Sequence, residues 1–153
     1  MKLTAFTDYS LRVLIFLAAD RGRRATVAEI ASAFDVSQNH LTKVVNVLAR
    51  KGWVSAVRGK GGGLLLARAP ADIVVGRVVR DTEGGAQPAE CFEAGGGDCA
   101  IARCCRLKGV LREAVEAFYA VLDNYTLADL VASPQAIIHV LGIHRPAQAA
   151  SFR

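Results

Sequence analysis

The sequence predicts a mainly α-helical fold with one small β-hairpin, and three observations support this. Apolar residues recur with helical spacing in three segments of the first fifty residues. A glycine-rich run, 59–63, separates two short apolar segments, as in a hairpin. Residues 106–124 have the apolar spacing of one long helix. Hydrophobic residues make up 52% of the 153 residues and charged residues 22%, which indicates a globular chain.

The first half contains the signals of three helices. A first helix is expected over 7–20, and a second begins with a capping box formed by Thr26 and Glu29. After a short turn, Ser37 caps a third helix, which ends at Gly52. Two short helices joined by a tight turn form a helix-turn-helix, so this motif is predicted for the second and third helices.

The exposed side of the third helix is polar and rich in amides, which can pair with base edges in the major groove of DNA. The alternative is an ordinary solvated face. The amides, however, crowd the N-terminal end of the helix, which is the end that such motifs insert into the groove. The candidate DNA-contacting residues of this helix are Ser37, Gln38, Asn39, His40 and Lys43.

The next segment predicts a β-hairpin of strands 53–58 and 64–67 around the glycine-rich tip. Arg58, Gly59 and Lys60 lie at this tip, where they can contact phosphates or a minor groove. A nucleotide-binding loop is disfavoured, because such a loop is followed by a helix and here a strand follows. The hairpin makes the predicted fold a winged helix-turn-helix. A further short helix is expected after it, over 72–83.

The charge is unevenly distributed. Residues 1–68 hold eleven Lys and Arg against four Asp and Glu, whereas 69–153 hold eight against ten. A basic first half favours a polyanionic partner such as double-stranded DNA, although a solvated basic surface would have the same composition. The longest apolar run near the start, 13–19, is far shorter than the ~20 residues needed to span a membrane. We therefore expect a cytoplasmic protein with no membrane partner.

Four cysteines lie close together in a Gly-rich segment: Cys91, Cys99, Cys104 and Cys105. A zinc site is disfavoured, because paired C-x2–4-C spacings and a nearby histidine are missing. A stable disulfide conflicts with the expected compartment, but a redox-switch disulfide remains open. An iron–sulfur cluster needs about four ligands on a loop that can wrap around it. Three spaced cysteines are compatible with such a cluster and leave one ligand position open.

The long helix, 106–124, would span about 30 Å, which is more than a small domain needs for itself. We expect it to pair with the same helix of a second subunit in a homodimer, the alternative being packing within one chain. The sequence thus divides into four expected regions. They are a DNA-binding domain (1–83), a cysteine-rich cluster-binding loop (84–105), a dimerisation helix region (106–131) and a C-terminal tail (132–153).

The chain resembles the winged-helix iron–sulfur repressors in the stretches 1–12 and 57–68 and in Cys105-Arg-Leu-Lys108. The resemblance implies three cysteine ligands and a fourth ligand, an N-terminal aspartate, from the other subunit. These positions correspond here to Cys91, Cys99, Cys105 and Asp8. For Asp8, capping of the first helix is the alternative role. Cys104 is an additional cysteine that could replace Cys105 or form a disulfide after loss of the cluster.

One branch of this family uses a histidine ligand three residues after the last cysteine, and Lys108 occupies that position here. The resemblance is therefore greatest to the nitric-oxide-sensing branch. It implies a dimeric repressor that releases its operator when nitric oxide nitrosylates the cluster, with a 4Fe–4S cluster favoured over 2Fe–2S. The alternative is a related regulator that responds to oxygen, iron status or thiol oxidation. No enzyme is expected, because no candidate base accompanies the cysteines in the sequence.

Overall fold

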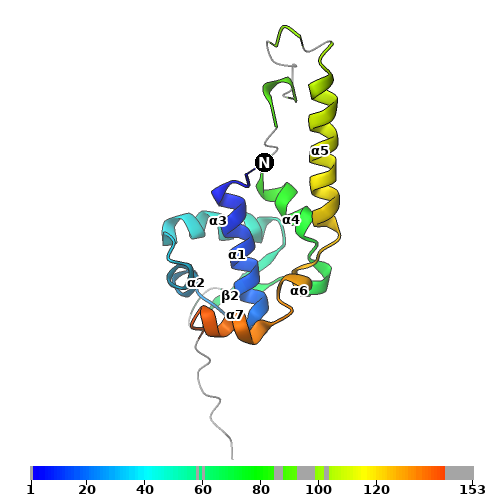
Figure 1. Ribbon diagram of the computed structural model, residues 1–153. Helices are drawn as coiled ribbons and strands as arrows, with labels where there is room; N and C mark the ends of the chain where they lie inside the picture. Colours follow the sequence, from blue (N-terminus) through cyan, green and yellow to red (C-terminus); the bar gives the residue numbers. More distant parts are fainter. Residues whose placement is uncertain are drawn as a thin grey trace, which may run out of the picture.

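The computed structural model describes residues 2–57, 59, 61–84, 88–92, 99–101 and 104–143. A helical body holds the first half of the chain, and one long helix extends beyond it (Figure 1). The helices are α1 (Ala5–Ala19), α2 (Val27–Phe34), α3 (Gln38–Arg50), α4 (Val75–Thr82), α5 (Arg106–Asp123), α6 (Leu127–Leu130) and α7 (Pro134–Val140). The strands are β1 (Val54–Val57) and β2 (Gly63–Leu66), and short 3-10 helices are η1 (Pro70–Asp72) and η2 (Glu90–Phe92). Within the described residues, no helix has the length and apolarity needed to cross a bilayer.

Local capping explains where the first helices begin. The Thr4 side chain accepts a hydrogen bond of 3.2 Å from the Thr7 N–H, so α1 starts two residues earlier than predicted. The predicted capping box of Thr26 and Glu29 is present at the start of α2. After α2, Asp35 adopts a left-handed conformation with φ of 50°, which turns the chain into α3. The predicted helix-turn-helix is therefore confirmed.

The hairpin that follows α3 is also present. Strand β1 pairs antiparallel with β2, with Val54 opposite Leu66. On its other edge β2 pairs with the segment before α2, through hydrogen bonds between Ala25 and Leu64 of 3.2 and 2.7 Å. The wing is thus anchored to the connection between α1 and α2, which fixes its orientation relative to the helix-turn-helix.

Gly63 is required where β2 passes this connection. Its φ is +150°, and an added Cβ would lie 3.0 Å from the Arg24 Cβ and 3.1 Å from the Ala25 carbonyl oxygen. We expect Gly63→Ala to lower the free energy of unfolding by about 1–3 kcal/mol, in urea denaturation. Gly22→Ala is the matched comparison, because Gly22 has a positive φ but open space around it. Equal losses in the two variants would show that the contact with residues 24–25 is unimportant.

One hydrophobic core joins the helix-turn-helix, the wing and the later helices. One residue from each of four helices is fully buried: Leu14 of α1, Ile30 of α2, Leu48 of α3 and Val78 of α4. Leu127 of α6 is 1% exposed. Helix α1 contacts most of the other helices and lies at the centre of this core. Changes in α4 or α6 can therefore reach the helix-turn-helix and the wing through direct packing.

The second half departs from the predicted elements in two places. A helix is predicted over 72–83, but α4 begins only at Val75, because Val74 forms a bridge with Thr126. The structure also contains α6 and α7, which the sequence pattern does not predict. Residues of α7 pack on α1, so part of the expected C-terminal tail belongs to the folded body.

Candidate nucleic-acid interface and cysteine pocket

Helix α3 has one buried face and one exposed face. The buried face consists of Leu41, Val44, Val45 and Leu48, which pack into the core. The predicted contact residues Gln38, Asn39, His40 and Lys43 are all exposed on the other side. Ser37 is the N-cap residue as predicted, but its side chain makes no capping hydrogen bond. Its exposed hydroxyl is therefore not engaged by the helix backbone.

The described part of the wing tip is held by an arginine. Arg24 donates a hydrogen bond of 2.8 Å from Nη1 to the carbonyl oxygen of Gly61. Gly59 is exposed and has a φ of 94°, which favours glycine there. The other two predicted tip residues, Arg58 and Lys60, lie outside the described residues.

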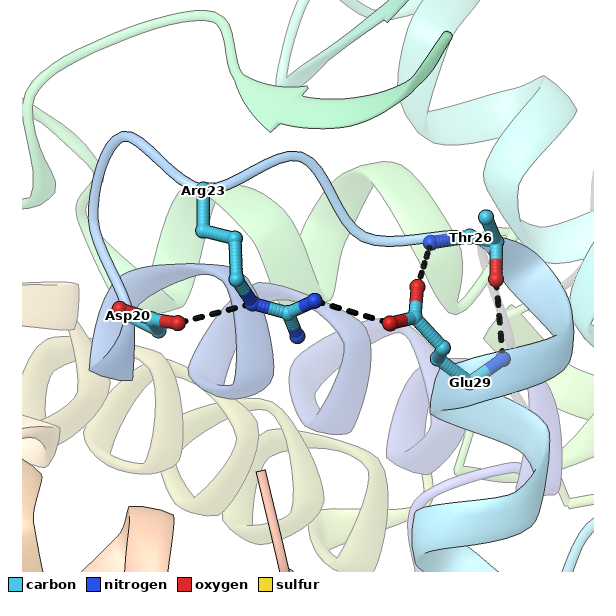
Figure 2. Close-up of polar contacts among 4 residues, drawn as sticks. All are labelled: Asp20, Arg23, Thr26 and Glu29. Atoms are coloured by element: carbon cyan, nitrogen blue, oxygen red, sulfur yellow. Dashed lines mark hydrogen bonds and ion pairs between the residues drawn. The ribbon is translucent and has the colours of Figure 1, made fainter. Parts of the chain in front are cut away.

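A polar network fixes α2 relative to the end of α1 (Figure 2). The Arg23 guanidinium donates to the carboxylates of Asp20 and Glu29, each at 2.8 Å. Glu29 also accepts a hydrogen bond of 2.6 Å from the Thr26 N–H and returns one from its own N–H to Thr26 Oγ1. Partial burial raises the pKa of Glu29, but the hydrogen bonds from Thr26 and Arg23 outweigh this and hold it below its usual value. The first helix of the motif is thereby clamped to the body.

Substitutions on the exposed face of α3 should affect DNA affinity in two different ways. We expect Gln38→Ala to weaken binding to a preferred DNA sequence by about 1–3 kcal/mol and to relax selectivity at one base pair.

Lys43→Ala should weaken binding to all sequences alike and lower the slope of log K against log salt by about 1. Fluorescence anisotropy on DNA selected by the protein from a random pool measures both. Gln135→Ala on α7 is the control, and a Gln38 effect that is uniform across sequences would exclude base reading.

Three of the four cysteines line one pocket. Cys91 on η2, Cys99 and Cys105 share this pocket, which has a volume of about 400 Å³. Cys105 is the N-cap residue of α5, so the start of this helix positions its side chain. Cys104 is absent from the described lining: it is exposed, and its thiol lies 3.5 Å from the Ile101 carbonyl oxygen. The structure thus separates the two adjacent cysteines.

The donor set of the pocket fits an iron–sulfur cluster in kind, because thiolates are the usual protein ligands of such clusters. Apolar side chains form much of the remaining wall, including Ile101, Leu107 and Leu111. In the described ranges no three Cys, His, Asp or Glu side chains are close enough together to hold a metal ion. The thiols therefore share a wall without forming a closed ligand set.

Lys108 lies in the same wall of the pocket. From the sequence it was notable only because a related branch of the family has a histidine ligand at this position. Its Nζ is 5.7 Å from the centre of the Phe92 ring, within the range of a cation–π contact. Phe92 follows Cys91, and Lys108 is one turn after Cys105. The contact therefore links the two segments that carry these cysteines. The one-turn spacing of Cys105 and Lys108 on a predicted helix is the sequence signal for this position.

Asp8 lies in the first turns of α1 and is not its capping residue, since Thr4 has that role. Its carboxylate forms an ion pair of 2.8 Å with Arg12, and its side chain is 44% exposed. The Arg12 guanidinium also lies over the ring of Phe34 on α2, 5.7 Å from its centre. Asp8 does not line the pocket of its own chain. Its exposure leaves it accessible to a second molecule.

Helix α5 has two apolar faces. Its inner face, which includes Leu111, Val115, Phe118 and Leu122, is half-buried, and the helix packs against α4. A second stripe along the helix is exposed and lacks a partner within the described residues. It includes Leu107, Val110 and Val121, which are between 57% and 59% exposed. Their spacings of three and eleven residues, about one and three helical turns, place them on one side of the helix, as in helix pairing.

Comparisons with known proteins agree with this architecture. Residues 3–133 match the Rrf2 family, described as an iron-dependent transcriptional regulator. The chain is 50% identical over 142 residues to the HTH-type transcriptional regulator NsrR of Bacillus subtilis, covering 92% of this chain and 97% of that protein. It is 48% identical over 132 residues to NsrR of Geobacillus kaustophilus, covering 86% and 90%. The solved structure of CymR (YrzC), the global cysteine regulator of B. subtilis, has a TM-score of 0.66 and 32% identity, covering 86% of this chain and 97% of that one.

The helix-turn-helix, its wing and these similarities define a DNA-binding transcription regulator with a winged-helix fold. More specifically, the chain belongs to the Rrf2 family.

Proposed function

We propose that the protein is a homodimeric repressor that senses nitric oxide through an iron–sulfur cluster and then releases its operator. One observation carries this proposal: Cys91, Cys99 and Cys105 line one pocket, and Cys104 lies outside its described lining. The 4Fe–4S cluster is the favoured type, with Asp8 of the second subunit as the fourth ligand. The similarity to proteins named NsrR supports the choice of signal. In this arrangement, 84–105 is the cluster-binding loop. It lies between a DNA-binding domain (1–83) and a dimerisation helix region (106–131). A C-terminal tail (132–153) follows.

The chain's own residues supply binding and orientation. The cysteines hold the cluster as thiolates, and Asp8 joins the α1 helix of one subunit to the pocket of the other. For Asp8 to reach that pocket, its carboxylate would have to give up the ion pair with Arg12. The cluster, when bound, supplies iron that reacts with nitric oxide. Loss of the contact between Asp8 and the partner's pocket would remove one constraint on α1, which packs directly on α3.

The dimer presents two copies of α3 to DNA. We propose that the exposed apolar stripe of α5 pairs with the same stripe of the partner, because burial of such a stripe is favourable and a symmetric pair matches a palindromic site. In such an arrangement the two recognition helices reach major grooves about 34–36 Å apart. A change in the distance between the two recognition helices would weaken binding to the two half-sites together.

A second candidate is a regulator that responds to thiol oxidation. The exposed thiols of Cys99 and Cys104 favour it, since accessible thiolates are the sites of oxidation. Loss of DNA binding under mild peroxide, with no response to nitric oxide, would establish this function instead. The reverse pattern supports the nitric oxide sensor.

The role of Asp8 can be tested by subunit complementation. Asp8→Ala and Cys105→Ala homodimers each lack one ligand at both sites. If Asp8 acts from the partner subunit, a mixed dimer of the two variants has one complete site and one site lacking both ligands. We therefore expect the mixed dimer to recover about half of the wild-type cluster absorbance and nitric oxide response.

Each variant remixed with itself is the control, and differently tagged subunits allow the mixed dimer to be isolated. If Asp8 acted within its own subunit, both sites of the mixed dimer would lack one ligand and no recovery would occur. Asp8→Ala protein with wild-type spectra and DNA affinity would remove Asp8 from the site altogether.

A further inference from the structure

Four consecutive residues at the end of α4, Arg80–Glu83, contact four different parts of the molecule. We call this segment the α4 junction. Its side chains reach α5, the end of α3 together with the wing, and the first turns of α1. The next residue, Gly84, has a φ of +63° and begins the segment that leads to the cysteines. The junction therefore lies where the cysteine segment leaves the body.

Arg80 joins the junction to the long helix. Its guanidinium donates two hydrogen bonds to the Asp123 carboxylate, of 2.7 and 2.6 Å, and lies 4.4 Å from the centre of the Tyr119 ring. Gly76, one turn earlier on α4, provides the space for this pair, because an added Cβ would collide with the Asp123 carboxylate. A paired, two-point contact of this kind fixes the orientation of α4 relative to α5.

Asp81 joins the junction to both DNA-reading elements. One carboxylate oxygen accepts a hydrogen bond of 2.9 Å from the indole N–H of Trp53, and the other forms an ion pair of 3.1 Å with Lys51. Lys51 is the C-cap residue of the recognition helix, and Trp53 directly precedes β1 of the wing. Trp53 is 3% exposed, and Arg68, just after β2, lies over its ring at 4.6 Å. One carboxylate thus holds the end of α3 and the base of the wing.

Thr82 and Glu83 join the junction to α1. The Thr82 hydroxyl is buried and accepts a hydrogen bond of 2.9 Å from the Thr7 hydroxyl. The Glu83 carboxylate accepts hydrogen bonds from the backbone N–H and the hydroxyl of Thr4, of 2.9 and 3.1 Å. Thr4 caps the helix that carries Asp8 one turn later. The end of α4 therefore also holds the helix that bears the proposed fourth ligand.

We propose that the α4 junction transmits the state of the cysteine pocket to the recognition helix and the wing, with Asp81 as the positioning residue for both. The inference rests on the proposed function and deepens it by naming the residues that couple the two sites. A rotation or shift of α4, imposed from the cysteine segment or from α5, moves the Asp81 carboxylate. The ends of α3 and the wing are bonded to that carboxylate and move with it.

The test compares DNA affinity of the full-length dimer in its cluster-loaded and cluster-free forms. Typical coupling between two sites changes affinity by roughly 5- to 150-fold. We expect a ratio in this range for the wild-type protein and a ratio near one for Asp81→Ala. The matched control is Asp72→Ala, at an exposed aspartate of η1, which should keep the wild-type ratio. Lys51→Ala, at an exposed residue, is a second variant should Asp81→Ala not fold. If Lys51 also contacted a DNA phosphate directly, its loss would lower the affinity of both forms alike and leave their ratio unchanged.

Trp53 supplies a readout that is independent of DNA, because it is the one tryptophan of the chain. Its emission maximum should differ between the loaded and cluster-free wild-type forms and should be the same in both forms of Asp81→Ala. A wild-type ratio of one would overturn the proposed function and this inference together. A wild-type ratio well above one that Asp81→Ala and Lys51→Ala both retain, with the Trp53 shift unchanged, would overturn the junction alone.

Discussion

Cys105→Ala protein should purify anaerobically without bound iron and should bind DNA as cluster-free wild-type protein does. The reason is that Cys105 is the N-cap residue of α5 and lies in the pocket with Cys91 and Cys99, so its loss leaves only two thiols there. Iron and sulfide assays, an absorption spectrum and DNA titration measure the effect. We expect a large effect, because the loss of a thiolate removes one of the cysteine ligands that hold such a cluster.

Cys104→Ala is the matched control for this prediction, since it removes a thiol from the adjacent residue. Cys104 is exposed and outside the described pocket lining, so its loss should leave iron content and DNA binding unchanged. The opposite pattern, with iron lost in Cys104→Ala and kept in Cys105→Ala, would assign the ligand to Cys104. Iron lost equally in both variants would mean that the cysteine segment as a whole is required.

Val110→Glu should convert the dimer into a monomer. Val110 belongs to the exposed apolar stripe of α5 and is 59% exposed in the single chain, so the substitution costs little within one subunit. In the dimer it would bury a charge against the partner helix, which is strongly unfavourable. Affinity for a full palindromic operator should fall by about 100-fold or more, because the two recognition helices no longer bind as a linked pair.

Sedimentation equilibrium and DNA titration at matched protein concentrations measure this effect. Arg112→Glu is the control, because Arg112 is exposed on a different side of α5 and its substitution makes the helix more negative by two charge units, against one for Val110→Glu. A Val110→Glu protein that remained dimeric would show that the subunit interface does not include this stripe. An Arg112→Glu protein that dissociated equally would show that net charge on α5, and not the stripe, is responsible.

The DNA-reading half could be predicted from the sequence because its signals are local. The capping box of Thr26 and Glu29, the turn at Asp35 and the glycine-rich hairpin each involve residues a few positions apart. Such signals act in the isolated segment and are only reinforced by packing. The exposed side of α3 followed directly from its helical periodicity, and the structure places the four predicted side chains there.

The second half was less predictable because its contacts are distant in sequence. The late start of α4 depends on the bridge between Val74 and Thr126, and no local pattern at 72–75 indicates it. Helix α6 did have a local signal, the capping box of Thr126 and Asp129, but four residues are too few for a periodicity to be recognised. The contacts of the α4 junction join residues between 28 and 79 positions apart, which spacing alone cannot pair.

For the candidate site, the sequence identified the cysteines but could not choose between Cys104 and Cys105 from the residues alone. The choice depends on the direction of the chain as it enters α5, which directs Cys105 into the pocket and Cys104 toward the Ile101 carbonyl. Asp8 could not be selected by periodicity either. Its assignment as a ligand stays a prediction, and the structure contributes its exposure and its ion pair with Arg12.

One nitric oxide titration would show whether a cluster in this cysteine pocket controls DNA binding and responds to nitric oxide. Protein purified without oxygen, with its iron and sulfide measured, is titrated with nitric oxide while its absorption spectrum and its binding to a selected DNA fragment are recorded together. We predict that cluster absorbance and DNA binding are lost over the same few equivalents of nitric oxide. DNA binding that persists after the cluster signal is gone, or preparations that never contain iron, would contradict the account.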